Sequence, residues 1–167
     1  MSVKIRPVTL QDDQAVSRLV GALINELRGV PPEEARALDV NMVRQVLSHT
    51  ESVSGFLLVD DENPIGVLML SESTALYAKG TFGTITELYV VKERRSSGLA
   101  EQLMARAVEY GKERGWTMLE VGAPPQPKWQ RSRAFYLNND FKEIGPRLRR
   151  RLITRPNGKE SAAFPAR

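Results

Sequence analysis

The sequence predicts one α/β domain built on a mixed sheet (an α+β arrangement), and three observations support this. Short apolar stretches with strand character alternate with amphipathic stretches at helical spacing. Strand–helix–strand units in the second half imply locally parallel pairing, and the other strands are expected to pair antiparallel. A chain of 167 residues with 41% apolar side chains is long enough to bury one core. The predicted order is β-α-α-β-β-β-α-β-α-β-β, with a domain over residues 1–155 and a polar, flexible tail over 156–167.

The first strand and the first helix have recognisable boundaries. The strand begins at Val3 and is closed by Pro7. Thr9 and Asp12 have the spacing of a capping box, which predicts that a helix starts there. Apolar residues then recur at helical spacing until Gly29, which is expected to stop the helix.

A second helix and three strands are expected next. Pro31 and Pro32 are expected to open the helix, because proline suits the first helical turn, and the apolar positions of this helix extend to Leu47. Polar turns separate the strands that follow. These strands are expected at Phe56–Val59, from Ile65 through Leu70, and at Ile85–Val91.

The second half continues with a long helix from Gly98 to about Arg114, which Gly115 is expected to end. The remaining expected elements are a strand at Met118–Val121, a rigid loop at Ala123–Pro127, a short helix at Trp129–Asn138, and two last strands at Phe141–Ile144 and Leu148–Thr154.

The composition excludes several kinds of site. The chain has no cysteine, which rules out disulfides, thiolate metal sites and a cysteine nucleophile. The single histidine, His49, rules out multi-histidine zinc sites and is expected to be an ordinary helix-end residue. The N-terminus has no apolar signal core, and no stretch approaches the roughly 20 apolar residues of a membrane span. These features predict a soluble, cytoplasmic protein without membrane association.

The net charge of +4 comes from the C-terminal end, chiefly from four arginines. These are Arg147, Arg149, Arg150 and Arg151. A basic segment of this kind is one way to bind nucleic acid, but no aromatic residues alternate with the arginines here. The sequence therefore disfavours nucleic acid as a partner and predicts arginines that face solvent or an acidic ligand.

The stretch from Leu88 to Ala100 has an anion-binding pattern. An apolar strand enters a short polar turn, and an amphipathic helix follows at once. Free N–H groups in the turn and in the first helical turn attract an anion, aided by the helix dipole. Gly98 lets the main chain approach a bulky ligand, and Arg95 adds a positive charge. The expected ligand is a pyrophosphate group, and the alternative is an ordinary strand-to-helix turn.

This stretch resembles motif A of the GNAT superfamily, the acetyl-CoA-dependent N-acetyltransferases. Val90 occupies the valine position at the strand end, and Arg95, Gly98 and Ala100 match Arg/Gln-x-x-Gly-x-Gly/Ala. The resemblance implies the GNAT fold from residue 3 to about 154.

A later block resembles a second family motif, Asn-x-x-Ala-x-x-Phe-Tyr-x-x-x-Gly-Phe, without gaps. The matching residues are Phe135, Tyr136 and Phe141. The departures are Trp129 for the asparagine, Ser132 for the alanine and Asp140 for the glycine. The first departure removes an amide that often contacts the cofactor arm in relatives, so no such contact is expected here.

The resemblance implies acetyl transfer from acetyl-CoA to a primary amine, by direct attack in a ternary complex and without a metal. It implies that the N–H of Val90 polarises the thioester carbonyl and that Tyr136 protonates the departing thiolate. The alternative for Tyr136 is a ring packed beside Phe135 with its hydroxyl in water. The residues implied in cofactor binding are Leu88, Tyr89, Val90, Arg95, Ser96, Ser97, Gly98, Leu99 and Ala100.

Glu87 is the candidate general base. An aliphatic amine with a pKa near about 10.4 must lose a proton before it attacks. Glu87 lies three residues before Val90 on the same strand, on the same face as Tyr89. The alternative is a surface carboxylate, and Glu72 and Glu120 are lesser candidates on neighbouring strands.

The acceptor is expected to be a small-molecule or lysine-type amine. The region of the first two helices carries acidic residues that suit a cationic acceptor, although a solvated helix face is the competing interpretation. These residues are Glu26, Glu33, Glu34 and Asp39. The resemblance also implies a homodimer. The main competing function is a non-catalytic acyl-CoA-binding GNAT-like regulatory module.

Overall fold

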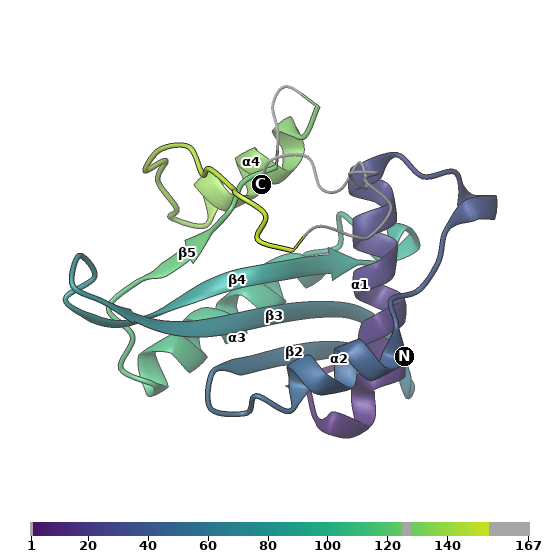
Figure 1. Cartoon of the computed structure of the whole chain (residues 1–167). Coiled ribbons are helices and arrows are strands. Elements are labelled where there is room, and N and C mark those ends of the chain that lie inside the picture. The colour runs from purple at the N-terminus through teal and green to yellow at the C-terminus, as the bar shows by residue number, and fades with distance from the viewer. Residues whose placement is uncertain (1, 125–127, 154–167) are drawn as a thin grey trace.

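The computed structural model describes residues 2–124 and 128–153, which contain a five-stranded sheet (Figure 1). The strands are β1 (Val3–Pro7), β2 (Val53–Asp60), β3 (Asn63–Ala75), β4 (Gly80–Val90) and β5 (Leu119–Val121). They lie in the order β1-β2-β3-β4-β5, with antiparallel pairing from β1 to β4 and parallel pairing of β5 with β4. The predicted mixed-sheet fold class is confirmed.

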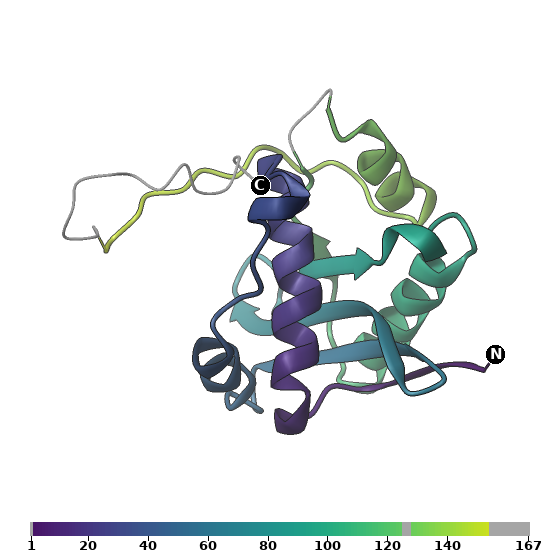
Figure 2. The same ribbon diagram turned by 90° about the vertical axis from the view of Figure 1, so that its right-hand side faces the viewer.

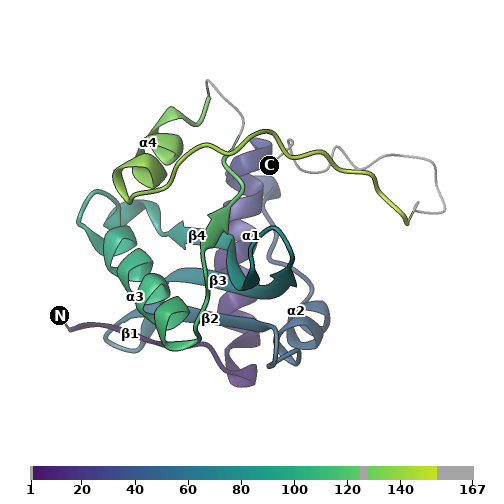
Figure 3. The ribbon, with the colours of Figure 1, turned by 90° about the vertical axis from the view of Figure 1, so that its left-hand side faces the viewer.

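Helices cover both faces of this sheet (Figures 2 and 3). The helices are α1 (Asp13–Arg28), α2 (Val40–Leu47), α3 (Leu99–Glu113) and α4 (Gln130–Asn138). Three short 3-10 helices accompany them, η1 (Leu10–Asp12), η2 (Pro32–Glu34) and η3 (Lys92–Arg94). The helices α1 and α2 lie on one face, and α3 lies on the other, where it connects β4 to the parallel strand β5.

The core consists of two layers because neighbouring strand residues point to opposite faces. On β2, Leu57 packs with α1 and α2, whereas Phe56 and Leu58 pack with α3. All three are at most 2% exposed, which shows that the sheet is buried on both faces. Apolar burial on both faces explains why this strand reads as a continuous apolar run.

The ends of the two long helices are as predicted. Gly29 follows α1 in a left-handed conformation with φ 66°, and its N–H donates to main-chain oxygens of the last turn. Gly115 follows α3 with φ 74°. Glycine is favoured at both positions because a Cβ atom strains a backbone with positive φ.

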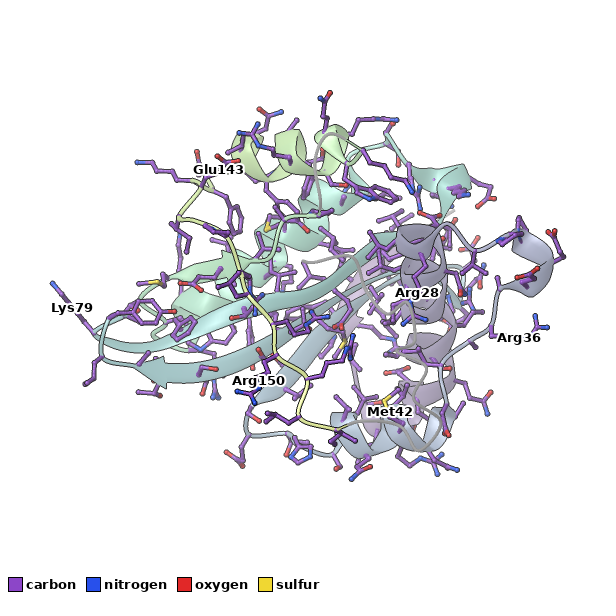
Figure 4. The ribbon with its side chains drawn as sticks, turned by 45° about the horizontal axis from the view of Figure 1, so that its top comes forward. Arg28, Arg36, Met42, Lys79, Glu143 and Arg150 are labelled. Atoms are coloured by element: carbon purple, nitrogen blue, oxygen red, sulfur yellow. The ribbon has the colours of Figure 1, made fainter. Side chains whose placement is uncertain are left out.

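The prediction of a continuous second helix beginning at Pro31 and Pro32 is wrong. The prolines open only η2, and an extended linker then carries Arg36 away from the sheet before α2 begins (Figure 4). The linker hydrogen-bonds to α1: Leu38 N–H donates to the Ser17 oxygen at 3.2 Å. The linker also passes so close to Gly21 that a Cβ there would lie 2.9 Å from a linker Cα.

Asp39 starts α2 at a later point than the sequence pattern indicated. Its carboxylate accepts hydrogen bonds from the N–H groups of Asn41 and Met42, at 2.8 and 3.3 Å. An aspartate in this position satisfies N–H groups that have no partner within the helix.

The two last predicted strands are not present in residues 141–153. This segment, here called the C-terminal arm, leaves α4 near Glu143 and passes Arg150 without joining the sheet (Figure 4). Its four large aliphatic side chains are 80–96% exposed. They are Ile144, Leu148, Leu152 and Ile153. A hairpin without a buried apolar face is only marginally stable, which is consistent with its absence. The described residues do not include Thr154, the predicted tail at 156–167, or positions 125–127 of the predicted loop.

Trp116 fixes the approach of β5 to β4. Its ring lies over Gly83 and Gly111, and its Nε1–H donates to Glu72 at 2.5 Å. A Cβ built on Gly83 would lie only 2.1 Å from the ring atom Cζ3 of Trp116. Gly83 on β4 therefore leaves the space that the indole of Trp116 occupies.

Replacing Gly83 with alanine should lower the free energy of unfolding by about 1–3 kcal/mol, because an added methyl group overpacks the contact with Trp116. Urea denaturation of the wild type and the Gly83→Ala variant measures this loss. The same substitution in a Trp116→Leu background should cost clearly less. An equal cost in both backgrounds would show that the ring is not the obstacle.

Candidate active site

The strands β4 and β5 separate halfway along the sheet. They pair only from Gly83 to Ile85 on β4, opposite Leu119–Val121 on β5, and β4 then continues to Val90 beside β3 alone. The register with β3 shifts at this point, since Leu70 faces Ile85 while Met69 faces Glu87, which leaves one additional residue on β4. Such a bulge bends a strand and increases its twist. The outer edge of β4 beyond Ile85 is consequently free of strand pairing within the described residues.

The N–H group of Val90 points toward this free edge. The next amide, that of Val91, donates to the Ile65 oxygen on the β3 side at 2.9 Å. Successive main-chain groups of a strand point to opposite edges, so those of Val90 point away from β3. The expected carbonyl-polarising group therefore faces the gap between β4 and β5.

The turn after β4 presents further N–H groups next to that gap. Ser96 and Gly98 both have positive φ, 60° and 76°, and α3 starts directly after Gly98. The Gln102 N–H is the first helical amide to bond back, to the Gly98 oxygen at 3.1 Å. The preceding amides have no partner within the helix, because the first turn of any α-helix lacks acceptors. A Cβ at Gly98 would meet no atom within 4 Å, so the turn is open on this side.

The turn is held in place by contacts with its neighbours. Arg94 forms an ion pair with Asp60 at the end of β2, and the Ser97 hydroxyl donates to the Arg94 oxygen at 2.6 Å. Arg131 of α4 donates to the Ser96 hydroxyl at 3.3 Å. The last contact brings a cation from α4 to the predicted anion site.

Arg95 is directed to α1. Its Nε donates to the Val90 oxygen at 2.9 Å, and its Nη2 donates to both carboxylate oxygens of Glu26 at 2.9 and 3.0 Å. Its guanidinium carbon lies 5.2 Å from the ring centre of Tyr89. The Tyr89 hydroxyl also approaches Glu26, at 3.4 Å. Burial and, after it, the charge of Glu26 raise the pKa of Tyr89, so its phenol stays neutral at physiological pH.

Among the other residues expected to bind a cofactor, some side chains belong to the core. Leu99 is buried, and Leu88 and Ala100 pack against the same apolar cluster under α3. The main chain of these residues remains the expected contact for a ligand in the gap.

Tyr136 lies on α4, on the face of the sheet that α3 covers. Its ring packs between Phe135 and Phe141, with ring centres 5.4 and 5.6 Å apart, against the core cluster under α3. The edge-on geometry of both contacts fixes the orientation of the phenol ring. The structure thus gives the three matching residues of the second block a common packing role.

Glu87 lies on the opposite face. It lies directly opposite Met69 on the neighbouring strand β3, and directly opposed residues of antiparallel strands share a face. Met69 and Tyr89 both belong to the core cluster under α1 and α2. The Thr86 hydroxyl donates to the Glu87 carboxylate at 2.5 Å. The two predicted catalytic side chains therefore lie on opposite sides of the sheet, with the edge of β4 between them.

The lesser base candidates have structural partners. Glu72 accepts two hydrogen bonds from Arg114 at 2.9 Å, in addition to the one from Trp116. The Arg114 bond is the main cause of the lowered pKa of Glu72, which weakens it as a base. Glu120 accepts from the Tyr77 hydroxyl at 3.0 Å. The sole histidine, His49, lies two residues after the last residue of α2, as expected of a residue near a helix end.

Two residues of this region did not stand out as site residues in the sequence. Glu26 reads as one of several acidic helix residues, and only the fold brings it to Arg95, which is 69 positions away. Arg131 lies between Trp129 and Ser132, in the part of the second block that departs from the family pattern. For Arg131, the only signal in the sequence was a basic residue at the start of the predicted short helix.

Neither a metal site nor a membrane span is present in the part of the chain that the structure describes. Over residues 2–124 and 128–153, no three acidic or imidazole side chains gather in a way that could hold a metal ion. No helix in these ranges is both long and apolar enough to span a bilayer.

The model of a family described as "Acetyltransferase (GNAT) family" matches residues 20–141, which include β4, the turn, α3 and α4. A comparison with curated proteins finds no match.

Solved structures share the fold at low sequence identity. A ribosomal-protein-alanine N-acetyltransferase from Brucella melitensis biovar Abortus 2308 has a TM-score of 0.74 and 18% identity, over 91% of this chain and 100% of that chain. An aminoglycoside acetyltransferase from an uncultured soil metagenomic sample has a TM-score of 0.75 and 18% identity, over 92% of this chain and 100% of that chain. A transcriptional regulator from Bacillus halodurans C-125 has a TM-score of 0.73 and 23% identity, over 90% of this chain and 100% of that chain.

Proposed function

The chain belongs to the GNAT acetyltransferase family, and we propose that it transfers an acetyl group from acetyl-CoA to a primary amine by direct attack in a ternary complex. The observation that carries the proposal is the gap between β4 and β5, which opens beside the N-terminus of a 15-residue helix, α3. A main-chain donor for a thioester oxygen and a main-chain site for a pyrophosphate thus occur side by side.

The turn from Arg95 to Ala100 would hold the pyrophosphate through its main chain. The open side of Gly98 and the unbonded amides of the first helical turn of α3 fit a diphosphate, because such groups bind anions without any side chain. The side chains of Ser96 and Ser97 lie in the same turn, and Tyr89 and Val90 would flank the pantetheine arm. Acetyl-CoA supplies the activated acetyl group and a good leaving thiolate.

The N–H of Val90 is positioned to donate to the acetyl oxygen as negative charge develops on it. A preorganised donor of this kind is typically worth about 10²–10³ in rate. Tyr136, on the α3 side, is the proposed acid for the leaving sulfur. A neutral phenol with a pKa near about 10 protonates a thiolate, whose acid has a pKa near about 8.5, only when it is well positioned. The edge-on contacts with Phe135 and Phe141 support the proposal, because they restrict the orientation of the ring.

Glu87 is the proposed base for the acceptor amine. Its position on the α1 and α2 face means that the amine and the leaving thiolate would be served from opposite sides of the sheet. Direct attack is compatible with this arrangement, because the incoming nitrogen and the departing sulfur occupy different positions on the same tetrahedral carbon. Glu87 would accept the amine proton, and Tyr136 would deliver its proton to sulfur.

The acceptor class is a primary amine on a small molecule or a lysine-type side chain. The related structures named above include acetyltransferases of an alanine on a ribosomal protein and of aminoglycosides, all of which carry amines. Glu33 and Glu34 of η2 favour a cationic acceptor.

The direct test measures CoA release from acetyl-CoA across a panel of polyamines, aminoglycosides and lysine peptides. Turnover should appear with one acceptor class. The Tyr136→Phe variant should lose at least about tenfold in kcat, because it cannot protonate the thiolate. Tyr110→Phe, which removes a hydroxyl from another core-packed ring, is the matched control and should retain activity. Tight CoA binding without turnover of any amine would favour the non-catalytic binding module.

Replacing Glu87 with glutamine should lower kcat about 10²-fold or more near pH 7, because general base catalysis typically contributes about 10²–10⁴. The deficit should shrink as the pH rises toward the pKa of the acceptor amine, since more of the amine is then already neutral. Rate profiles of both proteins from pH 6 to about 10 measure this. A deficit that stays constant over this range would contradict the assignment of Glu87 as the base.

Two glycines at opposite ends of α3 provide a test of the pyrophosphate site. Gly98 and Gly115 both have positive φ and open surroundings, so replacing either with alanine should cost a similar stability, about 1–2 kcal/mol. Only Gly98→Ala should weaken CoA binding, measured by calorimetry, because only this glycine lies in the turn. Equal CoA affinity of the two variants would place the phosphates elsewhere.

A further inference from the structure

The side chain of Arg95 has all its described contacts on the β4 and α1 side of the turn. Its Nε bonds to the Val90 oxygen, and its Nη2 bonds to both oxygens of Glu26, all at 2.9–3.0 Å. Lys92 is a further cation near Glu26, at 3.6 Å. The guanidinium of Arg95 is therefore paired with the carboxylate of Glu26 on α1.

These contacts hold the end of β4 at Val90, the residue whose N–H is the proposed donor to the acetyl oxygen. The peptide group that joins Val90 to Val91 is bonded at both ends, since its oxygen accepts from Arg95 and its N–H donates to Ile65. Both polar groups of Val90 point to the free edge, where no strand of the described sheet supports them. Without Arg95, the last residue of β4 would be held from the β3 side alone.

A different arginine lies over the turn. Arg131 reaches Ser96 from α4, whereas its neighbour Arg133 turns to Glu143 at 2.6 Å. The hydroxyl of Ser96 is neutral, so this contact does not compensate the positive charge of Arg131. A cation so placed suits the phosphates of a ligand bound at the α3 N-terminus.

We propose that Arg95 is a positioning residue for the Val90 N–H, held in place by Glu26, and that Arg131 supplies the side-chain cation for the phosphates of the acyl donor. This inference rests on the proposed acetyl transfer. It divides two roles that a single motif arginine would otherwise combine: Arg95 acts on the transition state through Val90, and Arg131 acts on donor affinity.

The two roles separate with a pair of donors. Acetyl-CoA carries the pyrophosphate, whereas S-acetylpantetheine lacks every phosphate. Arg95→Gln should lower kcat by at least about tenfold with both donors, because a small displacement of an oxyanion donor is costly. Its CoA affinity, measured by calorimetry, should stay within about twofold of the wild type. Arg131→Gln should weaken CoA binding at least about fivefold, leave kcat unchanged and leave the KM for S-acetylpantetheine unchanged.

Arg95→Lys distinguishes positioning from charge. Lysine keeps the charge but cannot donate to Val90 and to both Glu26 oxygens at once, so this variant should lose kcat as Arg95→Gln does. Glu26→Gln should reduce kcat in the same direction and to a lesser extent. Arg133→Gln removes a charge from the same helix as Arg131 and is the control that should leave CoA binding intact.

The resting protein offers a readout that needs no acceptor. The backbone amide of Val90, observed by NMR with ¹⁵N-valine labelling, should shift in Arg95→Lys and stay unchanged in Arg131→Gln. Loss of CoA affinity in Arg95→Gln, with normal turnover of S-acetylpantetheine, would overturn the proposal. If the wild type turns over no amine, acetyl transfer fails, while the calorimetry and the amide shift still decide between the two roles.

Discussion

The short parallel contact between β4 and β5 is the constraint on which the rest of the structure depends. Three residues of β4 are paired with β5, and the bulge then turns the rest of β4 away. A longer ladder would satisfy the main-chain groups of Val90 with a neighbouring strand and leave no room for a ligand. A shorter ladder would weaken the attachment of β5 to the sheet, because its pairing with β4 is confined to these residues. The gap exists because β4 and β5 pair on one side of the bulge only.

The two faces of the sheet give the two sides of this gap different surroundings. The core under α1 and α2 and the core under α3 are separate clusters, so a molecule in the gap touches two environments. Glu87 lies on the face of the first cluster, and Tyr136 packs against the second. The main chain of β4 lies between them and contributes the donor. The proposed chemistry needs few side chains, which is consistent with the absence of cysteine and with a single histidine.

Local signals in the sequence were sufficient for much of this architecture. Glycines at helix ends, such as Gly29 and Gly115, and the strand-turn-helix around Gly98 follow from backbone chemistry that depends on a few neighbouring residues. Long-range contacts were not accessible in the same way. The linker before α2 is extended because it bonds to α1, the bulge in β4 depends on its register with β3, and Glu26 meets Arg95 although the two are 69 positions apart in the sequence. The C-terminal arm shows the reverse case, in which strand-like spacing exists but no apolar surface of the described residues covers it.

The indole of Trp116 ties together positions that are far apart in the sequence. It lies on Gly83 and Gly111, bonds to Glu72, and meets the ring of Tyr110 edge-on with centres 5.5 Å apart. A smaller side chain at position 116 would remove the need for glycine at positions 83 and 111. Among relatives of this chain, positions 83, 111 and 116 should therefore change as a group, and such covariation would trace an evolutionary history separate from that of the ligand-binding turn.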